Sequence, residues 1–250
     1  MRRLTIILAS FFMGAGCVMG APAQSAPAFI PFQWNARTGV LQFTLTPERM
    51  ASEFLRFTGL DGGVGSMQGG GDRGTIGPTS LCRFERVGNK VLVIQENTRF
   101  RAVEGSPELQ HSVEYSFPVA VLAALPIVSE ENGTLTVNAN PLVLADTTGM
   151  ARQLRAPAAG LPPNPGANGG AAAGAWRLDE SRSGLVVDHT HAFPLNTETE
   201  ALLTFVSDNA RATTAAAPDI VTVRVHQSFV ALPPAGFTPR EADPRVGYFS

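Results

Sequence analysis

The chain has 250 residues, with 19 basic and 21 acidic side chains and a formal net charge of -2 at pH 7. Hydrophobic residues make up 44% of it, which is enough for a buried core. This charge balance excludes nucleic acid as an expected partner, because phosphate binding requires a clustered basic surface.

Residues 1–23 have the three-part layout of a secretory signal peptide. Two arginines open the segment, an apolar run extends to about Gly20, and the small-residue pattern Ala21-Pro22-Ala23 follows. Cleavage is expected after Ala23 or Ala26. We therefore expect a protein that is secreted or periplasmic. Basic residues are almost all arginine, with Lys90 the only lysine, which is typical of a GC-rich bacterial genome.

Two other interpretations of the leader stay open: an uncleaved N-terminal anchor, or lipidation at Cys17. No other stretch approaches the ~20 apolar residues of a membrane helix, so no stable span is expected after cleavage. Residues 24–34 are expected to be a flexible N-terminus.

The remaining chain alternates apolar and polar residues with period two, which predicts strands. Two tight hairpin turns are predicted at Gly88-Asn89 and Asn132-Gly133, because both pairs tolerate positive φ angles. The expected strands and hairpins cover residues 39–46, 81–97, 125–140, 175–179, 184–190, 199–207 and 220–232.

Helical signals are few. Residues 107–117 form one candidate helix, and residues 147–156 form another with Thr147 or Thr148 as its N-cap. The apolar run 119–125 is compatible with strand or helix. The fold class expected for residues 35–250 is mainly β, an antiparallel sandwich or open barrel-like sheet with one or two short helices.

Two segments lack periodicity. Residues 59–79 are rich in glycine and are interpreted as a surface loop, because the Lys-Ser/Thr ending of a phosphate-binding loop is missing. Residues 156–174 are a low-complexity stretch of proline, glycine and alanine. We interpret the second as a loop insertion in one domain, with an interdomain linker as the alternative.

Three histidines and two glutamates are the candidate chemical groups. His189 and His191 are two residues apart in a predicted strand, so they would project on one face, and His226 could add a third zinc ligand. Glu198 and Glu200 repeat this spacing of two, and one interpretation of them is an acid/base pair. The simpler interpretation, which we adopt, is that these side chains form the solvated face of strands, with no metal, catalytic or cofactor-binding residue assigned.

Cys82 is alone once the leader is removed, so no internal disulfide is expected. It alternates with Phe84 and is interpreted as a small buried hydrophobe rather than a reactive thiol. The motif His-Glu-x-x-His, which marks helical zinc proteases, is absent, since none of the four histidines is followed by glutamate. No Gly-x-Ser-x-Gly nucleophile motif occurs either.

Several long stretches, in order, resemble the N-terminal region of a family of exported bacterial zinc-dependent metalloproteases. The resemblance covers most of residues 52–250 and is carried by EFLRFTGLDGGVGS, DRGTIGPTSLCRFERVGNKVLVIQENTRFRA, VEYSFPVAVLAALPIVSE, HAFPLNTETEALLTF and VTVRVHQSFVALPPAGFTPREADPRVGYFS. It implies a metzincin-like catalytic domain downstream of Ser250. Zinc is expected in that domain and no cofactor in this chain.

The sequence departs from the family pattern at three places. Residues 156–174 look like an insertion, Ala123-Ala124 replace a bulkier pair, and His191 stands where the pattern carries Arg or Lys. A cation does not occupy a metal-ligand position, so the last departure counts against a zinc site there.

The function implied by the resemblance is a non-catalytic N-terminal domain of a secreted or periplasmic metallopeptidase-like protein. It would pack on the protease domain, in cis or in trans, or present substrate to it. The alternatives are a stand-alone exported β-rich binding module and a small metalloenzyme that uses His189, His191 and His226.

Overall fold

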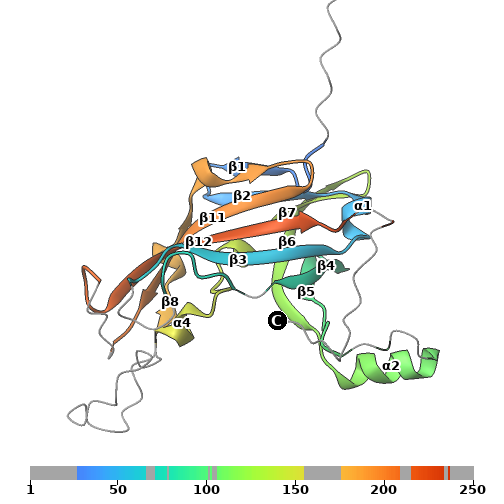
Figure 1. Ribbon diagram of the computed structural model, residues 1–250. Helices are drawn as coiled ribbons and strands as arrows, with labels where there is room; N and C mark the ends of the chain where they lie inside the picture. Colours follow the sequence, from blue (N-terminus) through green and yellow to red (C-terminus); the bar gives the residue numbers. More distant parts are fainter. Residues whose placement is uncertain are drawn as a thin grey trace, which may run out of the picture.

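The computed structural model describes residues 27–65, 71–77, 79–100, 102, 106–154, 176–208, 215–233 and 236. These residues form a mainly β protein in which one antiparallel sheet curls into a half-barrel (Figure 1). The fold class expected from the sequence, mainly β with an antiparallel sandwich or open barrel-like sheet, is confirmed, and the sheet takes the barrel-like form. One or two short helices were expected, and the described residues contain four, of which α2 (Pro107–Ser116) alone exceeds one turn.

The strands follow one another across the sheet in the order β1 (Phe32–Asn35), β2 (Val40–Leu45), β7 (Thr134–Asn138), β6 (Ala120–Glu131), β5 (Lys90–Gln95), β4 (Ser80–Val87), β3 (Phe54–Gly62), β12 (Ile220–Ala231), β11 (Asn196–Val206) and β10 (His191–Ala192). The short strands β8 (Arg177–Leu178) and β9 (Gly184–Leu185) also pair with β11. The helices of the described residues are α1 (Pro47–Met50), α2 (Pro107–Ser116), α3 (Asn140–Val143), α4 (Met150–Gln153) and two 3-10 turns, η1 (Glu180–Arg182) and η2 (Val187–His189).

Both predicted hairpin turns are present. Asn132 and Gly133 join β6 to β7 with φ angles of 51° and 80°, and Gly88 joins β4 to β5 with φ of 60°. Both central residues of the first turn have positive φ, and in the second turn Gly88 does but Asn89 does not. Turns of these kinds match the right-handed twist of the flanking strands. These turns therefore fix the register of two of the central hairpins.

The core lies on the concave side of the sheet. Side chains alternate between the two faces of β2, and Leu41, Phe43 and Leu45 are fully buried on the core side, as the sequence pattern predicted. The segment that follows β7 crosses this side and fills it, because Leu142 and Val143 of α3 are fully buried in the same hydrophobic cluster.

The two ends of the sheet approach each other through the residues that precede β1. The amide of Phe29 donates to the carbonyl of Phe193 at 2.7 Å. The amide of Ile30 donates to Oγ1 of Thr197 at 3.0 Å, and that hydroxyl donates back to the carbonyl of Ile30 at 2.9 Å. In Figure 1, β1 and β2 accordingly lie beside β11.

Several boundaries differ from the sequence-based expectations. Residues 24–34 were assigned to a flexible N-terminus, whereas Phe29 and Ile30 are buried in the core and β1 begins at Phe32. The glycine-rich segment 59–79 is not wholly a loop. Its first four residues belong to β3, which ends at Gly62.

The helical predictions are confirmed in part. α2 matches the helix expected at residues 107–117. In place of the helix expected at residues 147–156, the described residues contain only the single turn of α4. Its cap is neither Thr147 nor Thr148. The carboxylate of Asp146 instead accepts from the amides of Met150 and Ala151, at 2.7 and 2.9 Å.

The ambiguous run at residues 119–125 is strand, because β6 covers Ala120–Glu131. The strand expected at residues 184–190 is interrupted, since it is limited to Gly184 and Leu185 of β9 and η2 follows. The predicted leader, with Cys17, and the predicted insertion at 156–174 lie outside the described residues.

Candidate functional site

The candidate site lies on the face of the sheet opposite the core, across β11, β12 and β3. Thr197, Thr199 and Ala201 of β11 point inward and are buried, so Glu198 and Glu200 point to the opposite face. Antiparallel register places Glu200 opposite His226 of β12, and Glu198 opposite Ser228. The acidic residues of one strand therefore meet the basic and hydroxyl residues of the next.

Glu200 is the most buried charged group of this face, with 5% of its side chain exposed. Its Oε1 accepts from Nη1 of Arg224 at 2.5 Å, and its Oε2 accepts from Nδ1 of His189 at 2.9 Å. Both carboxylate oxygens thus have a donor, which compensates for the loss of water around the charge. The expectation that Glu200 belongs to a solvated face is wrong, because the side chains of η2 and β12 cover it.

Glu198 is held by three neighbours. Its Oε2 accepts from Nε2 of His226 at 2.7 Å and from the hydroxyl of Ser228, and its Oε1 accepts from the side-chain amide of Asn196. Burial acts to raise the pKa of the Glu198 carboxyl, but the three hydrogen bonds outweigh it and hold that pKa below its usual range.

His226 shows the opposite shift. The bond to Glu198 raises the pKa of the imidazole, burial opposes this effect, and the negative charges of Glu198, Glu200 and Asp61 add to it. His226 thus bonds diagonally to Glu198, although Glu200 is the residue opposite it in register.

Ser228, His226 and Glu198 do not form a catalytic triad. A triad needs the serine and the carboxylate on opposite nitrogens of the imidazole, so that one nitrogen takes the serine proton while the carboxylate holds the N–H of the other. Here both Ser228 Oγ and Glu198 Oε2 face Nε2 of His226, at 3.3 and 2.7 Å. Glu198 and Glu200 are also poorly suited to acid/base work, since each carboxylate is committed to cationic or hydroxyl partners.

The structure brings together two of the three histidines considered in the sequence. His189 and His226 line one cavity, of about 500 Å³, together with Glu200; the rest of its lining is Gly59, Leu60, Asp61, Gly74, Thr75 and Ile76. His191 does not line it. That side chain is exposed on β10, with its ring centroid 6.2 Å from that of Phe193.

The far wall of the cavity comes from the glycine-rich segment. Leu60 donates its amide to the carbonyl of Thr75 at 2.9 Å, and Gly74 donates to the carbonyl of Leu60 at 2.7 Å. These bonds attach residues 74–76 to β3. Sequence reasoning missed this wall and Asp61 because the segment was interpreted as a loop, and neither its spacing nor its composition indicates the pairing.

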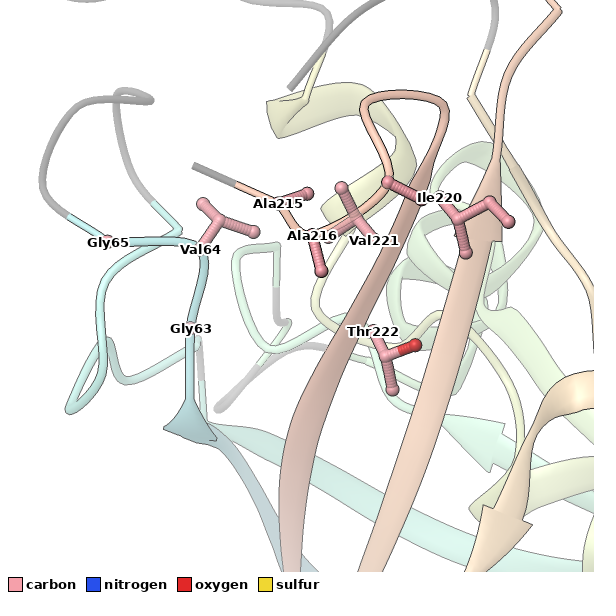
Figure 2. Close-up of a pocket in the computed structure, with 9 residues that line it drawn as sticks. Gly63, Val64, Gly65, Ala215, Ala216, Ile220, Val221 and Thr222 are labelled. Carbon is pink, nitrogen blue, oxygen red and sulfur yellow. The ribbon is translucent and has the colours of Figure 1, made fainter. Parts of the chain in front are cut away.

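A second hollow of about 580 Å³ lies at the end of β3 and β12 (Figure 2). Small and apolar residues line it: Gly63, Val64, Gly65, Ala215, Ala216, Ala217, Ile220 and Val221, with Thr222. Among the described residues of this lining the Thr222 hydroxyl is the one polar side-chain group, so they provide no convergent set of groups for chemistry.

Cys82 is fully buried in the core, as the sequence predicted. Burial raises the pKa of its thiol to about 11, while the positive charge of Arg56 acts to lower it. The side chain therefore behaves as a small hydrophobe at neutral pH.

Three His, Cys, Asp or Glu side chains are nowhere arranged to hold a metal ion within the described ranges. The helices of this same part of the chain are also too short or too polar to cross a membrane.

The fold and this face define a mainly β domain with a curled antiparallel half-barrel and a polar cavity on its outer side. Residues 74–250 match the model of a family described as a domain of unknown function, DUF5117. Because the match spans more than half of the chain, the protein belongs to the DUF5117 family. Searches of curated proteins and of solved structures gave no match.

Proposed function

We propose that this chain is the non-catalytic N-terminal domain of a secreted or periplasmic zinc-dependent metallopeptidase-like protein, and that it packs on the protease domain in cis or in trans. The resemblance of residues 52–250 to the N-terminal region of such proteins supports the class. A second, structural observation supports the packing role, and it concerns α2.

Helix α2 stands away from the sheet (Figure 1), and none of its ten residues is buried. Leu109 and Tyr115 are 52% and 81% exposed. Isolated helices shorter than ~12–15 residues are marginal in water, so most helices gain their stability by packing. A ten-residue helix with no fully buried residue in its own domain is therefore suited to pack against another.

Both ends of α2 make specific contacts with the rest of the domain or with its cap, so the helix is not a frayed segment. Phe100 and Phe117 stack with centroids 4.0 Å apart, and the side-chain amide of Asn97 donates to the carbonyl of Pro118 at 3.3 Å. Ser106 caps the first turn by accepting from the amide of Leu109. The helix is thus held in one place while its apolar side chains face outward.

Exposed apolar residues continue from the helix toward β6: Val119, just before β6, is 46% exposed, and Val121 of β6 is 56% exposed. We call Leu109, Tyr115, Val119 and Val121 the α2 surface. The charged residues of α2, Glu108 and Glu114, are acidic. A receiving surface on the protease domain would accordingly be apolar with a basic rim.

The test measures binding of the mature chain to the zinc protease domain encoded downstream or beside it, by calorimetry. The double variant Leu109→Ser, Tyr115→Ser should weaken binding about tenfold or more, because anchors of this kind carry most of the energy of an interface. The matched control is Val87→Ser. Val87 is also exposed, but it lies at the turn of the β4–β5 hairpin, whereas α2 follows the open end of that hairpin.

Absence of any in-frame or adjacent coding sequence for His-Glu-x-x-His would remove the partner and refute the proposal. Equal binding by the double variant and the wild type would refute the role of α2. Protease activity of the purified chain alone that a chelator abolishes would overturn the non-catalytic assignment.

The cavity beside His189, Glu200 and His226 favours one other function, that of a stand-alone exported binding module, because polar groups that converge in a concave site are typical of ligand binding. Sedimentation of the mature chain separates the two functions. A stable monomer favours the module, whereas association through the α2 surface favours a domain that lacks its partner.

A further inference from the structure

The floor of the outer-face cavity is a glycine that lies between two larger side chains. Gly59 of β3 pairs with Ile76 on one side and with His226 of β12 on the other. Paired antiparallel residues project on the same face, so Ile76 and His226 stand on either side of a position that has no side chain. Among the described residues, a Cβ built at Gly59 would meet only the carbonyl oxygen of Thr75 within 4 Å, at 3.4 Å. We call this space the Gly59 notch.

The two walls of the Gly59 notch differ in chemistry. Ile76 is 79% exposed and offers an aliphatic surface. The opposite wall is the imidazole of His226, a flat ring that is 40% exposed and is held by its 2.7 Å bond to Glu198. A space between an aliphatic surface and a flat ring fits a planar group that can stack on the ring.

The free polar atoms around the notch are hydrogen-bond acceptors. Asp61 projects on the same face as Gly59, and its partner within the described ranges is Arg73, 3.8 Å away and 80% exposed, which is a weak surface pair. His189 and His226 each donate one nitrogen to a carboxylate, so the other nitrogen of each neutral ring accepts. A ligand of this cavity must therefore supply donors.

The charge around the notch favours a cation. Three carboxylates belong to this part of the face, from Asp61, Glu198 and Glu200. Arg224 offsets the charge of Glu200, and the exposed Arg73 offsets that of Asp61 only weakly. A net negative charge therefore remains when both imidazoles are neutral.

We propose that the Gly59 notch binds the guanidinium group of an arginine side chain from another polypeptide, with Asp61 as its ionic partner and with Ile76 and the ring of His226 on its two faces. A guanidinium is planar, carries five N–H donors and no acceptor, and stacks on flat rings. The compact ammonium of lysine has neither the plane nor the fork of donors. The shape and the acceptors of the cavity thus select arginine.

The outer face continues beyond the notch as an apolar surface, which suits a polypeptide rather than a free amino acid. Leu55 and Phe57 of β3 project on the same face as Gly59 and are half-buried. They lie opposite Val230 and Ser228 of β12. Residues next to the bound arginine would contact this surface. The inference uses the cavity alone, so it does not depend on whether α2 packs on a protease domain.

The first test titrates the wild-type mature chain with N-acetylarginine N-methylamide at mildly alkaline pH, since protonated imidazoles would repel a guanidinium. Nitrogen-15 amide spectra should show saturable shifts at Gly59, Asp61 and Thr75, with a Kd of about 1 mM or less. The citrulline analogue has the same shape without the charge and should bind about tenfold more weakly. The lysine analogue should bind about threefold more weakly.

These ligands are compared on one protein, so the result does not depend on whether a variant folds. Equal binding of the citrulline or the lysine analogue would overturn the proposal, as would the lack of saturable shifts up to about 10 mM arginine analogue. The tripeptide Ala-Arg-Phe with blocked ends should bind more tightly than the single residue. Weaker binding of the tripeptide would show that the site does not accept a polypeptide.

Variants then test the two parts of the site separately. Asp61→Asn should weaken binding of the arginine analogue about tenfold, because it removes the charged acceptor. Gly59→Val fills the notch, leaves every charge in place, and should weaken binding at least as much. Glu53→Gln is the matched control, since Glu53 is exposed and outside the cavity, and it should bind as the wild type does. Unchanged binding by Gly59→Val, or equal loss in Glu53→Gln, would refute the assignment.

Discussion

Arg56 donates Nη2 to Oε1 of Gln227 at 2.9 Å inside the half-barrel, where these side chains are 4% and 1% exposed. Gln227 in turn donates Nε2 to the carbonyl of Val143 at 3.1 Å, at the end of α3. Within the described ranges no carboxylate pairs with Arg56. One neutral amide therefore joins a buried cation to the helix that fills the concave side.

Gln227→Leu should lower the free energy of unfolding by about 2–4 kcal/mol, because it leaves the guanidinium of Arg56 and the carbonyl of Val143 without partners in a buried site. Urea denaturation followed by circular dichroism measures the change. Gln33→Leu is the control, since Gln33 is exposed on the edge strand β1, and its effect should stay within about 0.5 kcal/mol. A cost for Gln227→Leu no larger than that of the control would contradict the bridging role.

The charged form of Arg56 is expected to destabilise the folded protein, because its guanidinium is buried. Burial lowers the pKa of its guanidinium to about 10, which corresponds to about 3 kcal/mol against the charged form. Replacing a buried ion by an apolar residue of similar size is often neutral or stabilising. The double variant Arg56→Met, Gln227→Leu should therefore be more stable than Gln227→Leu alone, and a less stable double variant would show that the charge has a favourable partner.

Cys82 should not react with iodoacetamide in the folded protein, because the thiol is fully buried and its pKa is about 11. The folded pKa lies above the ordinary 9.0, so the folded state binds this proton more tightly. Its contribution to stability is full below about pH 9 and is lost as the pH rises through about 11. Comparing the unfolding of wild type and Cys82→Ala at alkaline pH measures this contribution. Alkylation of the folded protein as fast as that of an exposed thiol would disprove the burial.

Much of the sheet could be predicted from sequence, because its hairpins follow local rules. Asn132-Gly133 specifies positive φ wherever it occurs, and the alternation of β2 or β12 reports which residues face a core. β3 escaped prediction because its pattern is inverted. Its inward residues include Arg56 and Thr58, while Phe57 points to the other face.

The candidate site could be predicted in its residue types but not in its pairings. A spacing of two put Glu198 and Glu200 on one face, yet it could not show that His226 bonds to Glu198 rather than to the opposite Glu200. His189 was expected on a strand beside His191, whereas η2 turns it over Glu200. Which side chains form hydrogen bonds across neighbouring elements depends on their three-dimensional placement, and the local sequence pattern does not determine it.

Gly133→Ala should destabilise the protein by about 1 kcal/mol, because φ of 80° is strained for any residue with a Cβ. The added methyl would also lie 3.4 Å from Cγ of Pro47. Gly184→Ala is the matched control, since nothing lies within 4 Å of a Cβ there and its φ is not positive. Thermal unfolding of the two variants measures the difference, and equal midpoints would show that the turn is not left-handed in solution.

Arg224→Met tests the electrostatics of the candidate site. It removes the guanidinium 2.5 Å from Oε1 of Glu200 and leaves His189 as the remaining side-chain partner of a carboxylate that is 5% exposed. Breaking a fully buried pair costs about 3–5 kcal/mol, but 35% of the Arg224 side chain is exposed, so we expect about 2 kcal/mol in urea denaturation.

The double variant Arg224→Met, Glu200→Gln should recover most of that loss, since it removes the stranded charge together with its partner. Arg86→Met is the control, because it breaks an ion pair with Glu130 of similar length, 2.8 Å, in which both side chains are more than 40% exposed. That variant should leave the unfolding midpoint unchanged. Two results would contradict this role: Arg224→Met as stable as Arg86→Met, or a double variant no more stable than Arg224→Met. Either result would mean that Glu200 does not need its guanidinium partner. Packing would then have to hold Glu200 against His189.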